Sequence, residues 1–73
     1  MINKQIELIR VIKNFIESHG YAPTIRELCK IMGISSPATM HNRLYSLKRR
    51  GYIDFEPSKS RTIRVINEDI NWL

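Results

Sequence analysis

The sequence predicts a mainly α domain in which three helices precede a small β-hairpin, and three observations support this fold class. Apolar residues recur every three or four positions from residue 3 to about residue 50, which is the period of a helix. Capping signals and glycines divide this region into separate helices. After Gly51 apolar and polar residues alternate, which is the period of a strand.

The first helix is predicted from Asn3 to about His19, where a glycine ends it. Its apolar residues lie at helical spacing: Ile6, Ile9, Ile12 and Ile16, with Val11 and Phe15 beside them. Pro23 disfavours helical angles at Ala22, so the chain after this helix forms a connector. The helix carries no recognisable chemistry, and we expect it to support the two helices that follow.

The second helix is predicted to begin at a capping box formed by Thr24 and Glu27. The threonine oxygen can accept a hydrogen bond from the amide three residues on, while the glutamate reaches back to the threonine amide. The apolar residues of this helix lie at helical spacing: Ile25, Leu28, Ile31 and Met32. Gly33 is suited to a left-handed C-terminal cap and ends the helix.

The third helix is predicted to begin at Ser36, because a serine N-cap directly before a proline is a strong start signal, and to run to Gly51. One narrow sector of it is apolar and should face the core: Met40, Leu44 and Leu47. The opposite side is small and polar at first and basic farther on: Ala38, Asn42, Tyr45 and Arg49, with Thr39 and His41 at the flanks. A helix that enters the major groove of DNA needs this arrangement, although a solvated amphipathic helix can share it.

Two predicted strands follow, Tyr52–Glu56 and Thr62–Ile66, joined by a polar loop that contains a proline. Lys59 and Arg61 in this loop would suit a DNA-binding wing, because a basic loop can lie along phosphates. An ordinary solvated turn explains the same residues equally well. Three helices and a basic hairpin together predict a three-helix winged helix-turn-helix over residues 1–66.

The composition limits the classes of function. Net charge is +5, and seven of the twelve Lys and Arg residues fall between positions 43 and 64, which predicts a polyanionic partner. The single cysteine, Cys29, excludes an internal disulfide and fits a cytoplasmic protein, and no apolar run could cross a membrane. His19 and His41 lack partners at metal-ligand or catalytic spacing. We therefore expect no enzyme activity, no metal and no cofactor.

Several sequence elements between Gly20 and about Ile66 form a recognisable combination. They are G-x-x-P-T-x-x-E-L, then G-I-x-S, then L-x-x-L-x-x-R-G-x-I. This pattern resembles the N-terminal DNA-binding domain of LexA-type SOS repressors, which implies a bacterial or phage transcriptional repressor. By the resemblance, base contacts come from the first two turns of the third helix: Ser36, Ala38, Thr39, His41 and Asn42. The resemblance also implies an inverted-repeat operator with GAAC and GTTC half-sites, of the kind that the Gram-positive branch of the family reads.

We expect further contacts to DNA phosphates from the helix pair: Thr24, Arg26, Arg43, Tyr45, Lys48, Arg49 and Arg50. Lys59 and Arg61 would hold the wing against the backbone. LexA proteins continue into a self-cleaving protease domain, whereas this chain stops at Leu73. The chain is therefore expected to be either an excised domain or a short regulator from a phage or mobile element, with dimerisation on DNA left open.

The main alternative is a winged-helix module that binds another protein. Residues 67–73 form an acidic tail with Trp72, and tryptophan is enriched at interface hot spots. A phage or mobile-element adaptor could use this tail to act on another regulator or on polymerase. RNA binding ranks third, because only Tyr45 offers an outward aromatic ring for stacking among the basic groups.

Overall fold

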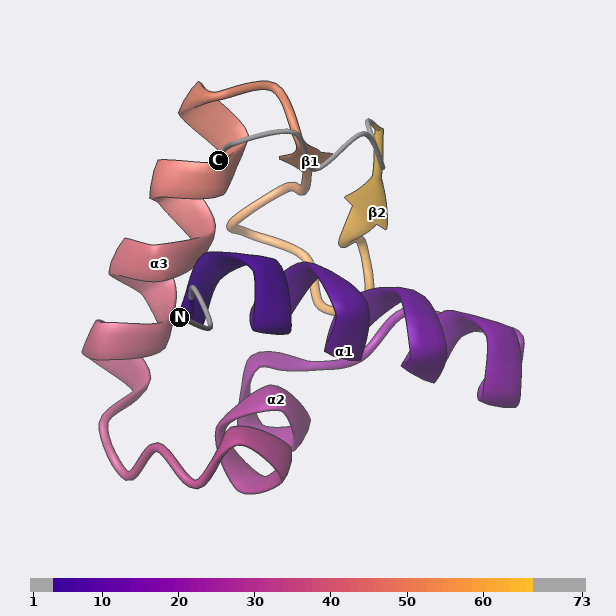
Figure 1. The fold of residues 1–73 in the computed structure, drawn as a ribbon, viewed down its shortest axis with the longest axis horizontal. Coiled ribbons are helices and arrows are strands. Elements are labelled where there is room, and N and C mark those ends of the chain that lie inside the picture. The colour runs from indigo at the N-terminus through magenta and orange to yellow at the C-terminus, as the bar shows by residue number, and fades with distance from the viewer. Residues whose placement is uncertain (1–3, 67–73) are drawn as a thin grey trace.

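A computed structural model describes residues 4–66 of the chain (Figure 1). Three helices come first in this part: α1 (Lys4–His19), α2 (Ile25–Met32) and α3 (Pro37–Arg49). Two short strands follow, β1 (Ile53–Asp54) and β2 (Arg64–Val65), and they pair as an antiparallel hairpin. The predicted fold class, three helices and a small hairpin, is confirmed. The predicted tail with Trp72 lies outside the described residues.

Local signals set the ends of α2. The oxygen of Thr24 accepts a hydrogen bond from the amide of Glu27 at 3.1 Å, and the Glu27 carboxylate accepts one from the amide of Thr24 at 2.8 Å. Gly33 ends the helix with a φ of 69° in the left-handed region. The predicted capping box and glycine stop are therefore both present.

The ends of α3 also follow the sequence signals closely. The oxygen of Ser36 accepts from the amide of Thr39 at 3.4 Å, and Pro37 occupies the first helical position. At the other end Gly51 has a φ of 82°, and the amide of Tyr52 donates to the carbonyl of Leu47 at 3.1 Å. Gly51 thus takes the left-handed position directly after the C-cap residue. The helix ends at Arg49, two residues before the predicted end at Gly51.

The hairpin is shorter than predicted, with two paired residues in each strand in place of five. Ile53 pairs with Val65 and Asp54 with Arg64. After Asp54, the backbone amides that would pair in a longer hairpin form hydrogen bonds with side chains instead. The Asp54 carboxylate accepts a hydrogen bond from the Phe55 amide at 2.9 Å. The hydroxyl oxygen of Thr62 accepts one from the Glu56 amide at 2.9 Å.

The core lies where the helices meet the hairpin. In Figure 1 α1 crosses the middle of the molecule, and it contacts α2 and β2, while α3 contacts α2 and β1. The core consists of these buried side chains: Leu8, Ile9, Ile12, Leu28, Met40, Leu44, Leu47, Ile53, Phe55 and Ile63.

Two parts of the predicted apolar pattern do not match the observed burial. On α1, Ile6 and Ile16 are only half-buried, because the buried stripe runs through Leu8 and Ile12. On α2, Ile31 is 51% exposed. It lies about 60° to one side of Leu28, while the other apolar residues of that helix lie on the opposite side. Ile31 is thus at the edge of the buried face.

Candidate nucleic-acid interface

Helix α3 presents one buried and one open side. Its core side chains have no exposed surface: Met40, Leu44 and Leu47. The open side consists of these exposed residues: Pro37, Ala38, Thr39, Asn42, Tyr45 and Arg49. The helix contains no Asp or Glu, so its outer surface carries only neutral and positive groups. The predicted division of this helix into a core side and an outward side is confirmed.

The five residues predicted to contact bases have different surroundings. Ala38, Thr39 and Asn42 are exposed on the open side of α3. Ser36 is half-buried, and its side-chain oxygen caps the helix. His41 is half-buried at the flank that faces the hairpin, and its ring lies 6.4 Å from the ring of Tyr45.

Three arginines that border this surface make no ion pair or hydrogen bond within the part of the chain that the structure describes. Arg26 is exposed in the first turn of α2, Arg49 is exposed in the last turn of α3, and Arg43 is half-buried midway along α3. Because their charges have no partner among residues 4–66, they are available to an external anion.

Two other predicted phosphate contacts are held within the protein. The Lys48 ammonium donates a hydrogen bond to the carbonyl oxygen of Phe55 at 2.9 Å and lies 5.0 Å from the centre of the Phe55 ring. It is also 3.6 Å from a carboxylate oxygen of Asp54. Arg50 donates to the side-chain oxygen of Gln5 at 3.2 Å. These contacts fasten the last two turns of α3 to β1 and to α1.

Asp54 is the acidic centre of this region. Its carboxylate lies 3.2 Å from Arg64 and 3.6 Å from Lys48. The hydrogen bond from Arg64 lowers the pKa of Asp54 below its ordinary value, and the bond from the Phe55 amide and the charge of Lys48 act in the same direction. The carboxylate therefore stays charged and compensates both cations.

The loop between the strands is closed by its own hydrogen bonds. The amide of Lys59 donates to the carbonyl oxygen of Glu56 at 3.0 Å, and the hydroxyl of Thr62 lies 3.2 Å from the carbonyl oxygens of both residues. The Lys59 ammonium is exposed and 3.7 Å from the Glu56 carboxylate. Such an exposed pair binds weakly, so Lys59 remains accessible to another anion.

Arg61 has the most contacts of the predicted wing residues. Its guanidinium lies 3.0 Å from the Glu27 carboxylate and 3.0 Å from the Ala22 carbonyl oxygen, and it stands 4.6 Å from the centre of the Tyr21 ring. These partners belong to the connector before α2 and to its first turn. Thr24, another predicted phosphate contact, already uses its oxygen to cap that turn.

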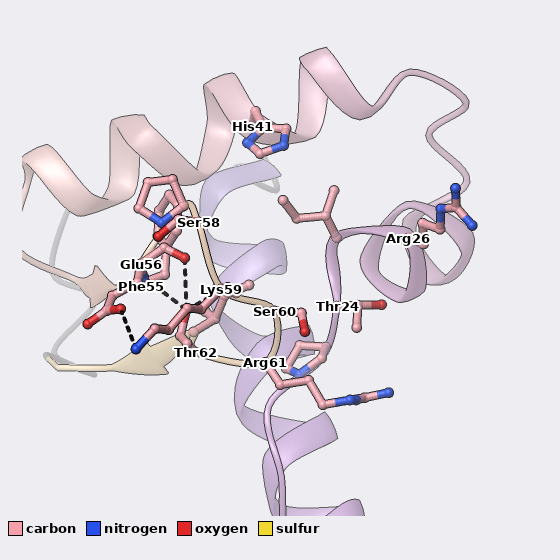
Figure 2. A pocket seen from close by; sticks show the side chains of 14 residues that line it. Thr24, Arg26, His41, Phe55, Glu56, Ser58, Lys59, Ser60, Arg61 and Thr62 are labelled. Atoms are coloured by element: carbon pink, nitrogen blue, oxygen red, sulfur yellow. Dashed lines mark hydrogen bonds and ion pairs between the residues drawn. The ribbon is translucent and has the colours of Figure 1, made fainter.

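A shallow hollow of about 240 Å³ separates α3 from the start of α2 and the loop (Figure 2). The ring of His41 projects from α3 toward this space, and Arg26 lies at the far end on α2. Lys59 and Arg61 border it from the loop side. The hollow therefore brings together residues that were predicted for base, phosphate and wing contacts.

Comparison with known proteins identifies the family. A family model described as the LexA DNA binding domain matches residues 1–62. The chain belongs to this family.

Curated relatives of this LexA-type domain carry the name LexA repressor. The chain is 39% identical over 69 residues to the LexA repressor of Caldicellulosiruptor saccharolyticus, a match that covers 94% of the chain and 34% of the relative. It is 42% identical over 66 residues to that of Clostridium kluyveri, covering 90% and 33%, and 35% identical over 71 residues to that of Limosilactobacillus reuteri, covering 97% and 34%. The chain thus spans about a third of the length of these relatives.

Sequence reasoning missed one role in this LexA-type domain. It assigned Glu27 to the helix cap alone, whereas the same carboxylate also binds Arg61 from the loop. No local pattern could reveal this pair, because 34 positions separate the two residues. Within residues 4–66 no group of His, Cys, Asp or Glu is placed to hold a metal, and no helix is long and apolar enough to span a membrane.

Proposed function

We propose that this domain binds double-stranded DNA in a sequence-specific manner and serves as the reading module of a LexA-like repressor. One observation carries the proposal. The open side of α3 has short uncharged side chains in its first two turns, an unpaired arginine in its last turn and no carboxylate. Short polar groups can reach base edges while the cations meet phosphates.

In this proposal Ala38, Thr39 and Asn42 read bases directly, with Ser36 and His41 at the two edges of the contact. Asn42 is the strongest candidate for a base-specific contact, because an asparagine amide can make two hydrogen bonds to adenine. A bidentate pair of this kind contributes about 1–3 kcal/mol of discrimination against the wrong base.

We expect the contribution of each cation to phosphate binding to depend on whether it already contacts another group of the protein. Arg26, Arg43 and Arg49 contribute most, because none of them has to leave a partner among the described residues to bind a phosphate. Lys48 and Arg50 contribute less, and Tyr45 and Thr24 can add neutral hydrogen bonds. Lys59 contacts the backbone from the loop.

The proposed target is an inverted repeat, bound by two copies of the domain. A single module makes few base contacts, whereas two modules on one duplex gain from each other's binding. The name that the relatives share, LexA repressor, supports repression as the outcome. The family match gives no support to the alternative of a protein adaptor, and Trp72 lies outside the described residues.

The test begins with selection of duplexes from a random-sequence pool by the wild-type protein. The selected duplex, a GAAC/GTTC inverted repeat, a single half-site and a scrambled duplex are then titrated at two salt concentrations. We expect enrichment of a defined sequence and tighter binding to a repeat than to its half-site. A pool that stays random, with equal affinity for all duplexes, would contradict sequence-specific binding.

A pair of variants then tests the reading surface. Asn42→Ala should lower the affinity for the selected duplex by about 1–3 kcal/mol and relax the preference at one base position. Asn14→Ala is the control, because Asn14 is also exposed but lies on α1. Equal losses in the two variants would show that α3 does not read the bases.

A further inference from the structure

The loop between the strands is fastened to the helix pair at Arg61. One guanidinium nitrogen of Arg61 lies 3.0 Å from Oε1 of Glu27, and the other lies 3.4 Å from Oε2. Two parallel bonds of this kind fix the orientation of both groups as well as their distance. The Ala22 carbonyl and the Tyr21 ring complete the surroundings of the guanidinium.

The backbone at this position is consistent with a fixed side chain. Arg61 has a φ of 57°, the only positive value at a non-glycine residue within the described part of the chain. An arginine rarely adopts this conformation, which persists where the surroundings hold the residue in place. The four contacts of the guanidinium supply that constraint.

Glu27 links this contact to the helix that precedes α3. Its Oε1 accepts both from the Thr24 amide and from Arg61. The hydrogen bond from Thr24 lowers the pKa of Glu27, and the hydrogen bond and charge of Arg61 lower it further. A charged Glu27 thus serves the first turn of α2 and the loop at the same time.

The charge of Arg61 is already compensated. A guanidinium that is paired with a carboxylate on two bonds presents little net charge to a phosphate, in contrast to Arg26 and Arg49, which have no partner among the described residues. Arg61 also lines the hollow toward which His41 projects (Figure 2), whereas Glu27 is not part of its lining. The pair joins the loop to α2, and α2 in turn packs against α3.

We propose that Arg61 is a positioning residue, which together with Glu27 holds the loop at a fixed distance from α3 so that both can engage one DNA site. Arg61 does not act as a phosphate contact. This inference rests on the proposed DNA-binding function and deepens it, because it assigns the geometry of the site to an ion pair between the loop and α2.

The decisive variant is Glu27→Gln. Glutamine retains the oxygen that caps α2 but loses the charge that holds Arg61. If Arg61 contacts phosphate, removing a neighbouring carboxylate should strengthen binding to every duplex. If Arg61 positions the loop, Glu27→Gln should weaken binding to the selected duplex roughly fivefold and should not weaken binding to the scrambled one.

Arg61→Lys supplies the second comparison. Lysine keeps the positive charge but cannot form the two-bond pair with a carboxylate. The positioning role predicts a loss similar to that of Glu27→Gln, and a double variant no weaker than either single one. A phosphate-binding role predicts near wild-type affinity and an unchanged salt dependence for Arg61→Lys.

Glu17→Gln is the matched control, because it removes an exposed carboxylate from α1 and measures the effect of charge alone. Circular dichroism and thermal unfolding verify that each variant is folded. A wild-type preference that survives both Glu27→Gln and Arg61→Lys would overturn the positioning role and leave the proposed function intact. A wild-type protein without any sequence preference would overturn the proposed function, and the inference with it.

Discussion

The cations of this domain fall into two groups according to what lies beside them. Arg26, Arg43 and Arg49 have no protein partner among the described residues, whereas Lys48 and Arg64 lie within 4 Å of Asp54. An unpaired cation that meets a phosphate releases a counterion from the DNA, while a paired one must first leave its carboxylate. Charge counted from the sequence therefore overstates the charge that is available for binding.

Arg49→Ala should weaken binding to all duplexes and reduce the slope of log affinity against log salt by about 0.9, the value for one lost phosphate contact. Arg64→Ala should change the slope less than Arg49→Ala does, although Arg64 is 73% exposed, because its guanidinium donates a hydrogen bond to Asp54 at 3.2 Å. The looser pair of Lys59 and Glu56, 3.7 Å apart, has no such bond. Titrations at four or more salt concentrations measure both slopes. A slope reduction as large for Arg64→Ala as for Arg49→Ala would show that pairing does not decide availability.

The sequence predicted which residue types line the candidate site, but it did not predict how those residues pair with one another. The open side of α3 could be predicted, because helical periodicity alone determines which residues point away from Met40 and Leu44. The pair between Glu27 and Arg61 could not, because it depends on how the loop folds back onto α2. Contacts across 34 positions follow from packing and leave no local pattern.

The elements differ in how well the sequence determines them. The ends of α2 and α3 were predictable, because a capping box, a serine before a proline and a terminal glycine act within a few residues. The length of the strands was not. The length of each strand depends on whether its backbone amides pair with the other strand or with nearby side chains such as Asp54 and Thr62.

Gly51→Ala tests the end of α3. Gly51 has a φ of 82°, and an added Cβ would meet no atom within 4 Å. The substitution should therefore destabilise the domain by about 1–2 kcal/mol through backbone strain alone. Urea unfolding measures the change at an unchanged m-value. Gly51→Asn should cost less, since asparagine tolerates the left-handed region better than alanine. No loss of stability in Gly51→Ala would contradict the assigned cap.

The whole molecule depends on a small core. Within residues 4–66 a cluster of ten buried side chains joins the three helices and the hairpin. A chain of 73 residues has a stability of only about 4–11 kcal/mol. Each core residue thus carries a large share of the total. The same packing holds the open side of α3 in place, because Met40, Leu44 and Leu47 anchor that helix from within.

Leu44→Ala should destabilise the domain by about 2–5 kcal/mol, because it leaves a cavity under α3. Ile31→Ala should cost about 1 kcal/mol or less, since Ile31 is 51% exposed and loses little buried surface. Thermal unfolding followed by circular dichroism compares the two. Similar midpoints for both variants would mean that the core does not lie where the structure places it.

The stability of the whole domain should also depend on pH through Glu27 and Asp54. The ordinary pKa is 4.5 for the carboxyl of Glu27 and 3.8 for that of Asp54, and in the folded protein the pKa of each group is lower than this. The hydrogen bond from the Thr24 amide is the main cause for Glu27, and the hydrogen bond from Arg64 is the main cause for Asp54. Since the folded state binds protons less readily, these groups stabilise it above the ordinary pKa values, and the stabilisation is lost as the pH falls through the lower, folded-state values.

Urea unfolding between pH 7 and about pH 2.5 should therefore show a free energy of unfolding that falls on the acid side of the ordinary carboxyl pKa values. The double variant Glu27→Gln, Asp54→Asn should lose part of this acid dependence, because two groups that titrate differently in the folded and unfolded states are gone. Glu17→Gln, which removes one exposed carboxylate from α1, is the comparison variant. If the double variant kept the wild-type slope, the loop pair and the Asp54 cluster would contribute nothing to folding, and Arg61 would have no charged partner strong enough to hold the loop against α2.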